Sequence, residues 1–153
     1  MRTLDSTDLR ILRVLQQDGN LTVAQVAERA GLTQSPCSRR IQAMSESGVI
    51  TGRTVELNRD KLGFGLLVES RIKLHAHDAK LLETFKASVQ AIPEVQSAML
   101  MLGEFDFRLQ VVVRDIKHYQ VLLQEKLTSL PGIKEIQSAV VLETVKSTHA
   151  LPL

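Results

Sequence analysis

The chain has 153 residues, of which 44% are hydrophobic and 24% are charged, with a net charge of +2. This length fits one or two small domains, and the apolar content is sufficient for folded cores. No apolar run reaches the roughly 18–20 residues of a membrane-spanning helix, and the N-terminus lacks the pattern of a secretory signal. A single cysteine, Cys37, excludes an intrachain disulfide. We therefore expect a cytoplasmic protein.

The first predicted element is a helix that ends at the turn-forming sequence Asp18-Gly19-Asn20. Acidic side chains at positions 5 and 8 would lie near its N-terminus, where they suit the helix dipole. Its apolar face would consist of Leu4, Ile11, Leu12 and Leu15.

Two short helices joined by a glycine turn follow. Thr22 and Gln25 have the spacing of a capping box, and Gly31 suits a helix C-cap because a positive φ costs glycine little. Pro36 is tolerated in the first turn of the next helix. The segment therefore predicts a helix-turn-helix motif over residues 23–42. In its second helix, Cys37, Ile41 and Met44 would face inward.

The outward face of that second helix carries small polar and basic side chains. Residues 33–45 contain two arginines and no acid, and arginine and glutamine can form bidentate contacts with guanine and adenine. We expect Arg39 to contact bases or phosphates. Arg40 lies nearer the core edge, so it would form an ion pair or a phosphate contact. The predicted DNA-contacting set is Thr22, Thr33, Gln34, Ser35, Ser38, Arg39, Arg40, Gln42 and Arg53.

The alternative interpretation is an ordinary helical hairpin with a solvated face. The capping box, the glycine turn and the acid-free helix together favour the interpretation as a DNA-binding motif. Residues 1–60 hold eight arginines against seven acids, so several subunits would have to bind together. No aromatic residue precedes Phe64, which argues against single-strand binding by base stacking.

A short hairpin or wing is expected over residues 49–57, with Arg53 near its tip as a phosphate contact or a solvated turn residue. The predicted domains are a helix-turn-helix domain over residues 1–52, a linker or hairpin over 53–65, and a second domain over 66–153.

An internal repeat fills the second domain. Strands are predicted at residues 66–74, 95–102, 105–113 and 133–143, and helices at 78–91 and 115–129. The order βαββαβ implies a ferredoxin-like antiparallel sheet with both helices on one face. The fold class is thus α+β: an N-terminal three-helix, winged helix-turn-helix domain joined to a C-terminal ferredoxin-like domain.

The strand segments SAMLML, VVV and AVVL are apolar at consecutive positions. A sheet with helices on one side should alternate instead, so both faces of this sheet are expected to be covered. A second copy of the chain would form that cover, which predicts a homodimer. The alternative is that the N-terminal domain folds over this face.

With these elements in order, the chain resembles the Lrp/AsnC, or feast/famine, family of regulators. The resemblance rests on five segments in sequence: LDSTDLRILRVLQQDGNLT, GLTQSPCSRRIQAMSESGVI, VELNRDKLGF, LGEFDFRLQVVVRD and VLETVKSTHALPL. It implies that the first domain binds duplex DNA and that the second dimerises, with dimers joining into tetramers or octamers. It also implies small effectors, usually amino acids, bound at dimer–dimer contacts.

Carried onto this chain, the family's Gly-x-x-Asp effector turn spans residues 101–106. The resemblance implies that Gly103 permits close approach of a ligand and that Asp106 meets an ammonium group or braces the hairpin. The implied effector-binding set is Met101, Leu102, Gly103, Glu104, Asp106, Gln137 and Ser138. The competing interpretation of residues 103–106 is a simple β-turn.

We therefore predict a sequence-specific, oligomeric transcriptional regulator that is nucleoid-associated, responds to an amino acid and has no other cofactor. One alternative is a nucleoid-structuring protein of low sequence preference. The other is an enzyme of the tetrapyrrole-decarboxylase type on the same architecture. Such an enzyme would need histidine or arginine in a pocket for an anionic substrate, and the histidines of the chain are His75, His77, His118 and His149. His75 and His77 could also suggest a metal site, but only Asp78 could add a nearby third ligand. No catalytic triad or phosphate-binding loop is visible, so we expect neither an enzyme nor a metal site.

Overall fold

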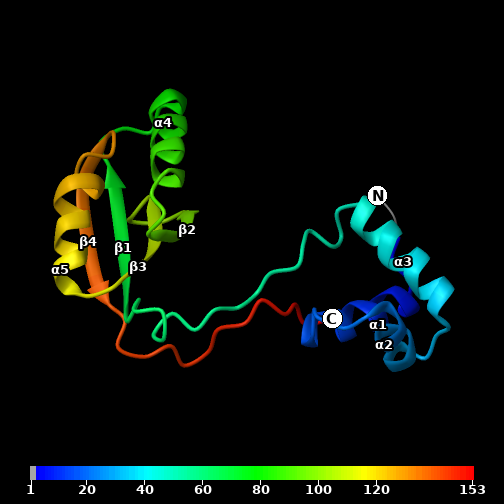
Figure 1. Ribbon diagram of the computed structural model, residues 1–153. Coiled ribbons are helices and arrows are strands. Elements are labelled where there is room, and N and C mark those ends of the chain that lie inside the picture. The colour runs from blue at the N-terminus through cyan, green and yellow to red at the C-terminus, as the bar shows by residue number, and fades with distance from the viewer. Residues whose placement is uncertain (1–2) are drawn as a thin grey trace. The chain divides into compact units, whose positions relative to one another are not determined.

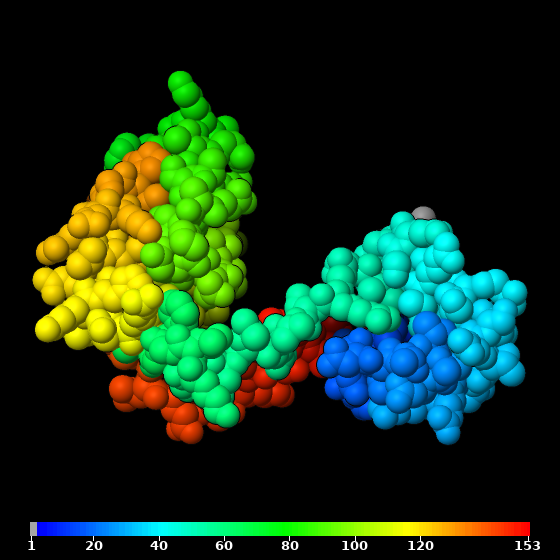
Figure 2. All heavy atoms as spheres, in the orientation of Figure 1, coloured from blue at the N-terminus to red at the C-terminus, as the bar shows by residue number. Residues whose placement is uncertain are grey.

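The computed structural model describes residues 3–153 and forms two compact units (Figure 1; Figure 2). One unit combines the segment that ends at Glu56 with the C-terminal segment Lys146–Leu153. The other unit is Leu57–Val145. The C-terminal segment, which we expected to lie with the second domain, thus clusters with the first. Within the described range, no helix has the length and apolar character needed to cross a membrane.

The first unit contains the three predicted helices, α1 (Ser6–Gln17), α2 (Val23–Ala30) and α3 (Gln34–Glu46). The predicted capping box of Thr22 and Gln25 opens α2, and Gly31 ends it with φ of 69°. A second capping box, between Asp5 and Asp8, opens α1. The helix-turn-helix arrangement is therefore confirmed, with each helix starting or ending where the sequence provides a chemical signal.

A small hydrophobic core holds the three helices together. Ala27 is buried in it, and its small side chain allows α2 to pack closely against its neighbours. Cys37 and Met44 are the fully buried residues of α3, as predicted. Burial raises the pKa of the Cys37 thiol, so this group acts as a packing residue rather than a nucleophile. The core cluster is Ile11, Leu12, Leu21, Val26, Ala27, Ala30, Cys37 and Met44.

The hairpin or wing expected over residues 49–57 is not formed. No strand precedes Leu66 in the described part of the chain, and residues 51–58 have no regular secondary structure. Val55 and Leu57 are 79% and 71% exposed, so this segment has no core of its own to pack against. A two-stranded hairpin without such a surface is only marginally stable in water.

The second unit has the predicted βαββαβ order. Its elements are β1 (Leu66–Leu74), α4 (Ala79–Gln90), β2 (Val95–Leu100), β3 (Phe107–Val113), α5 (Ile116–Leu122) with the π-helical turn η1 (Leu123–Leu127), and β4 (Ile133–Val140). The four strands pair antiparallel in the order β2-β3-β1-β4. The ferredoxin-like fold is therefore confirmed.

Both helices pack on one face of this sheet. The helix-facing residues of β1 and β3 alternate with outward residues and are almost completely buried. Phe85 of α4 stacks against Phe107 of β3, with ring centroids 4.4 Å apart. One polar cluster interrupts this core: the Tyr119 hydroxyl lies 2.9 Å from the Ser70 hydroxyl and 2.6 Å from the Ser138 hydroxyl. These contacts satisfy hydroxyls that would otherwise be unfavourable in an apolar interior.

The opposite face of the sheet is more polar than predicted. In the register of β1 and β3, Glu69 pairs with Gln110 and Arg71 with Arg108, and all four positions point away from the helices by strand alternation. Arg108 forms a bidentate ion pair with Glu69, and this hydrogen-bonded pair lowers the pKa of the Glu69 carboxyl. The prediction that consecutive apolar residues serve both faces therefore holds only in part, because Leu109, Val111 and Val113 point toward the helices and only Val112 of this strand adds an apolar side chain to the opposite face. Apolar residues surround the polar centre instead: Leu67, Met99, Val112, Ala139 and Val141.

The turn glycine of the helix-turn-helix provides a direct test of this fold. A Cβ at Gly31 would meet no atom within 4 Å, so only its left-handed backbone opposes substitution. We expect Gly31→Ala to lower the free energy of unfolding by about 1 kcal/mol. Gly19→Ala is the matched control, because Gly19 has neither a positive φ nor a close neighbour, and it should change stability by less than about 0.5 kcal/mol. Equal effects in urea denaturation would contradict the assigned turn.

Candidate nucleic-acid interface and ligand turn

The outward face of α3 is the first candidate site. Because Cys37 and Met44 fix the buried side of the helix, the polar residues of α3 project from the other side. This exposed set is Gln34, Ser35, Ser38, Arg39 and Gln42. The Gln42 amide donates to the Glu46 carboxylate at 2.8 Å, whereas no intramolecular partner engages the other four side chains in the described part of the chain. Side chains of this kind are available to contact base edges and phosphates in a major groove.

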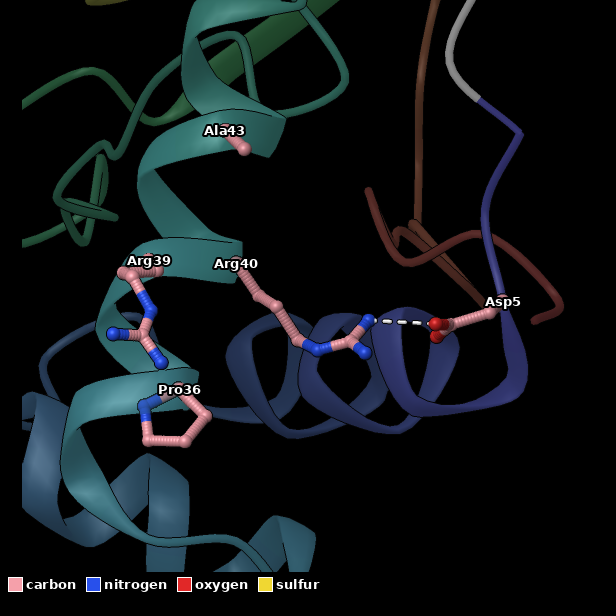
Figure 3. A pocket seen from close by; sticks show the side chains of 5 residues that line it. All are labelled: Asp5, Pro36, Arg39, Arg40 and Ala43. Carbon is pink, nitrogen blue, oxygen red and sulfur yellow. Dashed lines mark hydrogen bonds and ion pairs between the residues drawn. The ribbon is translucent and has the colours of Figure 1, made fainter.

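The two adjacent arginines of α3 have different roles (Figure 3). Arg40 extends from α3 to the start of α1, where one guanidinium nitrogen lies 2.7 Å from the Asp5 carboxylate and 2.9 Å from the Asp8 carboxylate. Asp8 is 1% exposed. Of the two interpretations offered by the sequence, Arg40 therefore adopts the ion pair, and its partners are the two acids of the α1 capping box.

These hydrogen bonds favour the charged forms of Asp5 and Arg40. The Asp8 backbone amide and then the Arg40 guanidinium lower the pKa of the Asp5 carboxyl. Asp5 and Asp8 raise the pKa of Arg40 in turn. The pairing links α3 to α1, and the carboxylates of Asp5 and Asp8 neutralise the positive charge of Arg40 within the domain.

Arg39 is exposed and, among residues 3–153, has no hydrogen-bond or ion-pair partner. It borders an open hollow of about 430 Å³ between α3 and the start of α1, lined by Asp5, Pro36, Arg39, Arg40 and Ala43 (Figure 3). Since Asp5 and Arg40 neutralise each other there, Arg39 supplies the uncompensated positive charge. Its guanidinium can form the bidentate contacts that sequence-reading arginines make.

The remaining predicted DNA-contacting residues differ in availability. The Thr22 hydroxyl is used in the capping box of α2, where it accepts from the Gln25 amide at 3.3 Å. Thr33 is the N-cap residue of α3 but makes no side-chain cap hydrogen bond, so its hydroxyl remains available. Arg53 is exposed in the irregular segment after α3, rather than at the tip of a hairpin.

The second candidate site is the connection between β2 and β3. The Met101 amide donates to the Asp106 carbonyl at 2.8 Å, and the Asp106 amide donates to the Ile72 carbonyl at 2.9 Å. These bonds fix both ends of the turn, while Leu102 and Glu104 between them are exposed. The turn therefore presents residues 102–104 away from the body of the domain.

Asp106 braces the neighbouring chain rather than pointing freely outward. Its carboxylate accepts from the Leu74 amide at 2.7 Å and lies 2.7 Å from the His77 imidazole. Partial burial alone would raise the pKa of Asp106, but the hydrogen bonds from Leu74 and then His77 outweigh it and lower the pKa. Between the two roles that the resemblance implied for Asp106, the geometry supports the bracing role.

Gly103 needs no special backbone conformation. Its φ is not positive, and a Cβ there would meet nothing within 4 Å. The fold of this chain therefore does not itself require glycine, and the open space above Gly103 remains free for another molecule.

The structure does not bring all seven predicted effector residues together. Gln137 pairs with Arg71 in the middle of β4, at the opposite edge of the sheet from β2. Gln137 and Ser138 are consecutive strand residues and so point to opposite faces, and Ser138 contacts Tyr119 on the helix side. Within one chain, only residues 101–106 form a continuous surface.

Several contacts around both sites have no signal in the sequence. The sequence indicates a helix-dipole role for Asp5 and Asp8 and offers only a metal-ligand role for His77. The i, i+3 spacing of the two acids could have indicated a capping box, but nothing local links them to Arg40, more than 30 positions away. No group of three potential metal ligands occurs between residues 3 and 153.

A helix-turn-helix with a free arginine, joined to a ferredoxin-like domain with an exposed turn, defines a DNA-binding protein with a separate ligand-binding domain. Residues 4–51 match the family described as winged helix-turn-helix DNA-binding, and residues 68–151 match the Lrp/AsnC ligand binding domain. The chain belongs to the Lrp/AsnC family of DNA-binding transcriptional regulators.

The relatives support this assignment over nearly the full length. The chain is 37% identical to a proline dehydrogenase transcriptional activator of Rhizobium radiobacter, covering 95% of this chain and 93% of that protein. It is 37% identical to the leucine-responsive regulatory protein of Salmonella typhimurium, covering 98% and 92%. It also superimposes with a TM-score of 0.93 on a transcriptional regulator of Neisseria meningitidis solved as a complex with L-Met, at 35% identity and covering 98% and 97%.

Arg40→Ala should destabilise the first unit, because the buried Asp8 carboxylate loses a charged hydrogen-bond donor. We expect a clear decrease in the thermal midpoint for this variant. Arg39→Ala is the matched control: it removes the same charge from the neighbouring position and should leave the midpoint unchanged. A decrease of equal size for both variants would refute the distinct roles assigned to the two arginines.

Proposed function

We propose that the chain regulates transcription by inserting α3 into the major groove of specific duplex sites, with Arg39 contacting bases or phosphates. The observation that carries this proposal is the pair of adjacent arginines, one neutralised by Asp5 and Asp8 and one free. Thr33, Gln34, Ser35 and Ser38 would add polar contacts from the same exposed surface.

Two copies would bind together through the second unit. Apolar side chains exposed at the edge strands and around the polar centre of the helix-free sheet face supply the surface for this association. A dimer would present two copies of α3 to successive major grooves, about 34 Å apart. Further association into tetramers or octamers would add half-sites and compensate for the small net charge of each chain.

The ligand would be an amino acid bound at the turn of residues 101–106. The support is the exposed, backbone-anchored turn with open space at Gly103, together with the L-Met complex of the Neisseria meningitidis relative. Gln137 and Ser138 could join this site only from another copy of the chain, since β4 lies at the far edge of the same sheet.

This proposal places the protein in the cytoplasm, on the nucleoid, with no catalytic activity and no cofactor. A nucleoid-structuring role with little sequence preference is the alternative, but the net charge of +2 supplies little of the sequence-independent attraction to phosphates on which such binding depends. The two are separated by the ratio of affinities for an upstream regulatory duplex and a random duplex at physiological salt. Similar affinities would favour the structuring role.

Arg39→Ala should weaken binding to the chain's own upstream duplex by roughly tenfold, since it removes a bidentate or phosphate contact. The measurement is a fluorescence-anisotropy titration. Arg114→Ala serves as the control because it removes the same charge from an exposed position in the ligand-binding unit. Unchanged affinity for Arg39→Ala, with fold and oligomeric size retained, would exclude this arginine from the interface.

Gly103→Val should leave the unliganded protein as stable as the wild type, because the position has room and an ordinary φ. It should abolish the increase in thermal midpoint produced by the amino acid that binds the wild type, since the added side chain occupies the space above the turn. A screen of the twenty amino acids by thermal shift identifies that ligand. A full ligand response in Gly103→Val would place the ligand elsewhere.

A further inference from the structure

The C-terminal segment of the chain is bound to α1 through its main chain. The Leu151 amide donates to the Gln16 side-chain oxygen at 2.6 Å, and the Gln16 side-chain nitrogen donates to the Leu151 carbonyl at 3.3 Å. The Arg13 guanidinium donates to the Leu153 carbonyl at 2.9 Å. In Figure 1 this segment, drawn in red, ends beside α1.

The contact consists of hydrogen bonds between side chains of α1 and the main chain of the segment, and not of buried apolar side chains. Arg13 and Gln16 are three residues apart and therefore share one face of α1. The carboxamide of Gln16 engages both polar groups of one residue, as a neighbouring strand would. Leu151 and Leu153 remain 67% and 40% exposed, so their side chains contribute little burial.

Two local features of the segment favour this docked conformation. The Ala150 amide donates to the Thr148 hydroxyl at 3.1 Å, and the Leu153 amide donates to the Leu151 carbonyl at 2.9 Å. Pro152 has a fixed φ, which reduces the conformational freedom that docking removes. The segment is thus partly ordered by its own residues.

We propose that the Arg13–Gln16 face of α1 is a docking surface for the chain's own C-terminal segment. Residues 141–145 separate this segment from β4, and the segment belongs to the same compact unit as α1. The docking does not rest on the proposed function.

Hydrogen exchange of the full-length protein tests the docking directly. In the wild type, the amide of Leu151 should exchange at least roughly tenfold more slowly than an unstructured amide, because Gln16 accepts its hydrogen bond. Gln16→Ala should remove this protection while retaining α1, since alanine is a strong helix former. Mass spectrometry of a peptide containing Leu151 provides the readout.

Two controls separate main-chain docking from other effects. Gln17→Ala changes the same residue type at the next position, which is exposed, and should preserve protection. Leu151→Ala retains the amide while shortening the exposed side chain, and should also preserve it. Exchange at the unstructured rate in the wild type, or protection that survives Gln16→Ala, would overturn the proposal. Neither outcome depends on DNA or ligand binding.

Discussion

The DNA-binding unit depends on one ion-pair network, in which Arg40 of α3 bonds to the two acids that open α1. The hydrophobic core alone would hold α3 against α1 and α2, but apolar contacts are not directional. Hydrogen bonds from one guanidinium to Asp5 and Asp8 add a directional constraint on the orientation of α3 relative to α1. Because Arg40 is held in this network, it is not available to contact DNA, and Arg39 is the available cation of the helix.

The ligand-binding unit uses a comparable division between braced and free groups. Asp106 is held by the Leu74 amide and by His77, so it fixes the end of the turn. The exposed residues between Met101 and Asp106 do not brace another segment in this way, and Gly103 in particular faces open space. In each unit, one charged residue is bonded within the chain and lies next to a residue or turn that, among the described residues, has no such bond. Arg40 lies beside Arg39 on α3, and Asp106 lies beside residues 102–104.

Local chemistry in the sequence predicted most of the fold. The Thr22–Gln25 capping box, the Gly31 cap and the repeated strand–helix–strand pattern each depend on residues close in sequence, so the elements could be located without the structure. Partners distant in sequence could not be inferred, as with Arg40 and Asp5 or Gln16 and Leu151. The polar centre of the free sheet face was missed because consecutive valines obscured the strand phase that directs Glu69 and Arg108 outward.

The most direct test of the separate roles of Arg39 and Arg40 is the salt dependence of DNA binding by the wild type, Arg39→Ala and Arg40→Ala. A phosphate or base contact by a cation releases counterions, so its loss lowers the slope of log affinity against log salt by about 1. We expect this decrease for Arg39→Ala and an unchanged slope for Arg40→Ala, because two carboxylates already neutralise the charge of Arg40. A lowered slope for Arg40→Ala with a wild-type slope for Arg39→Ala would contradict the assignment of Arg39 to the DNA interface.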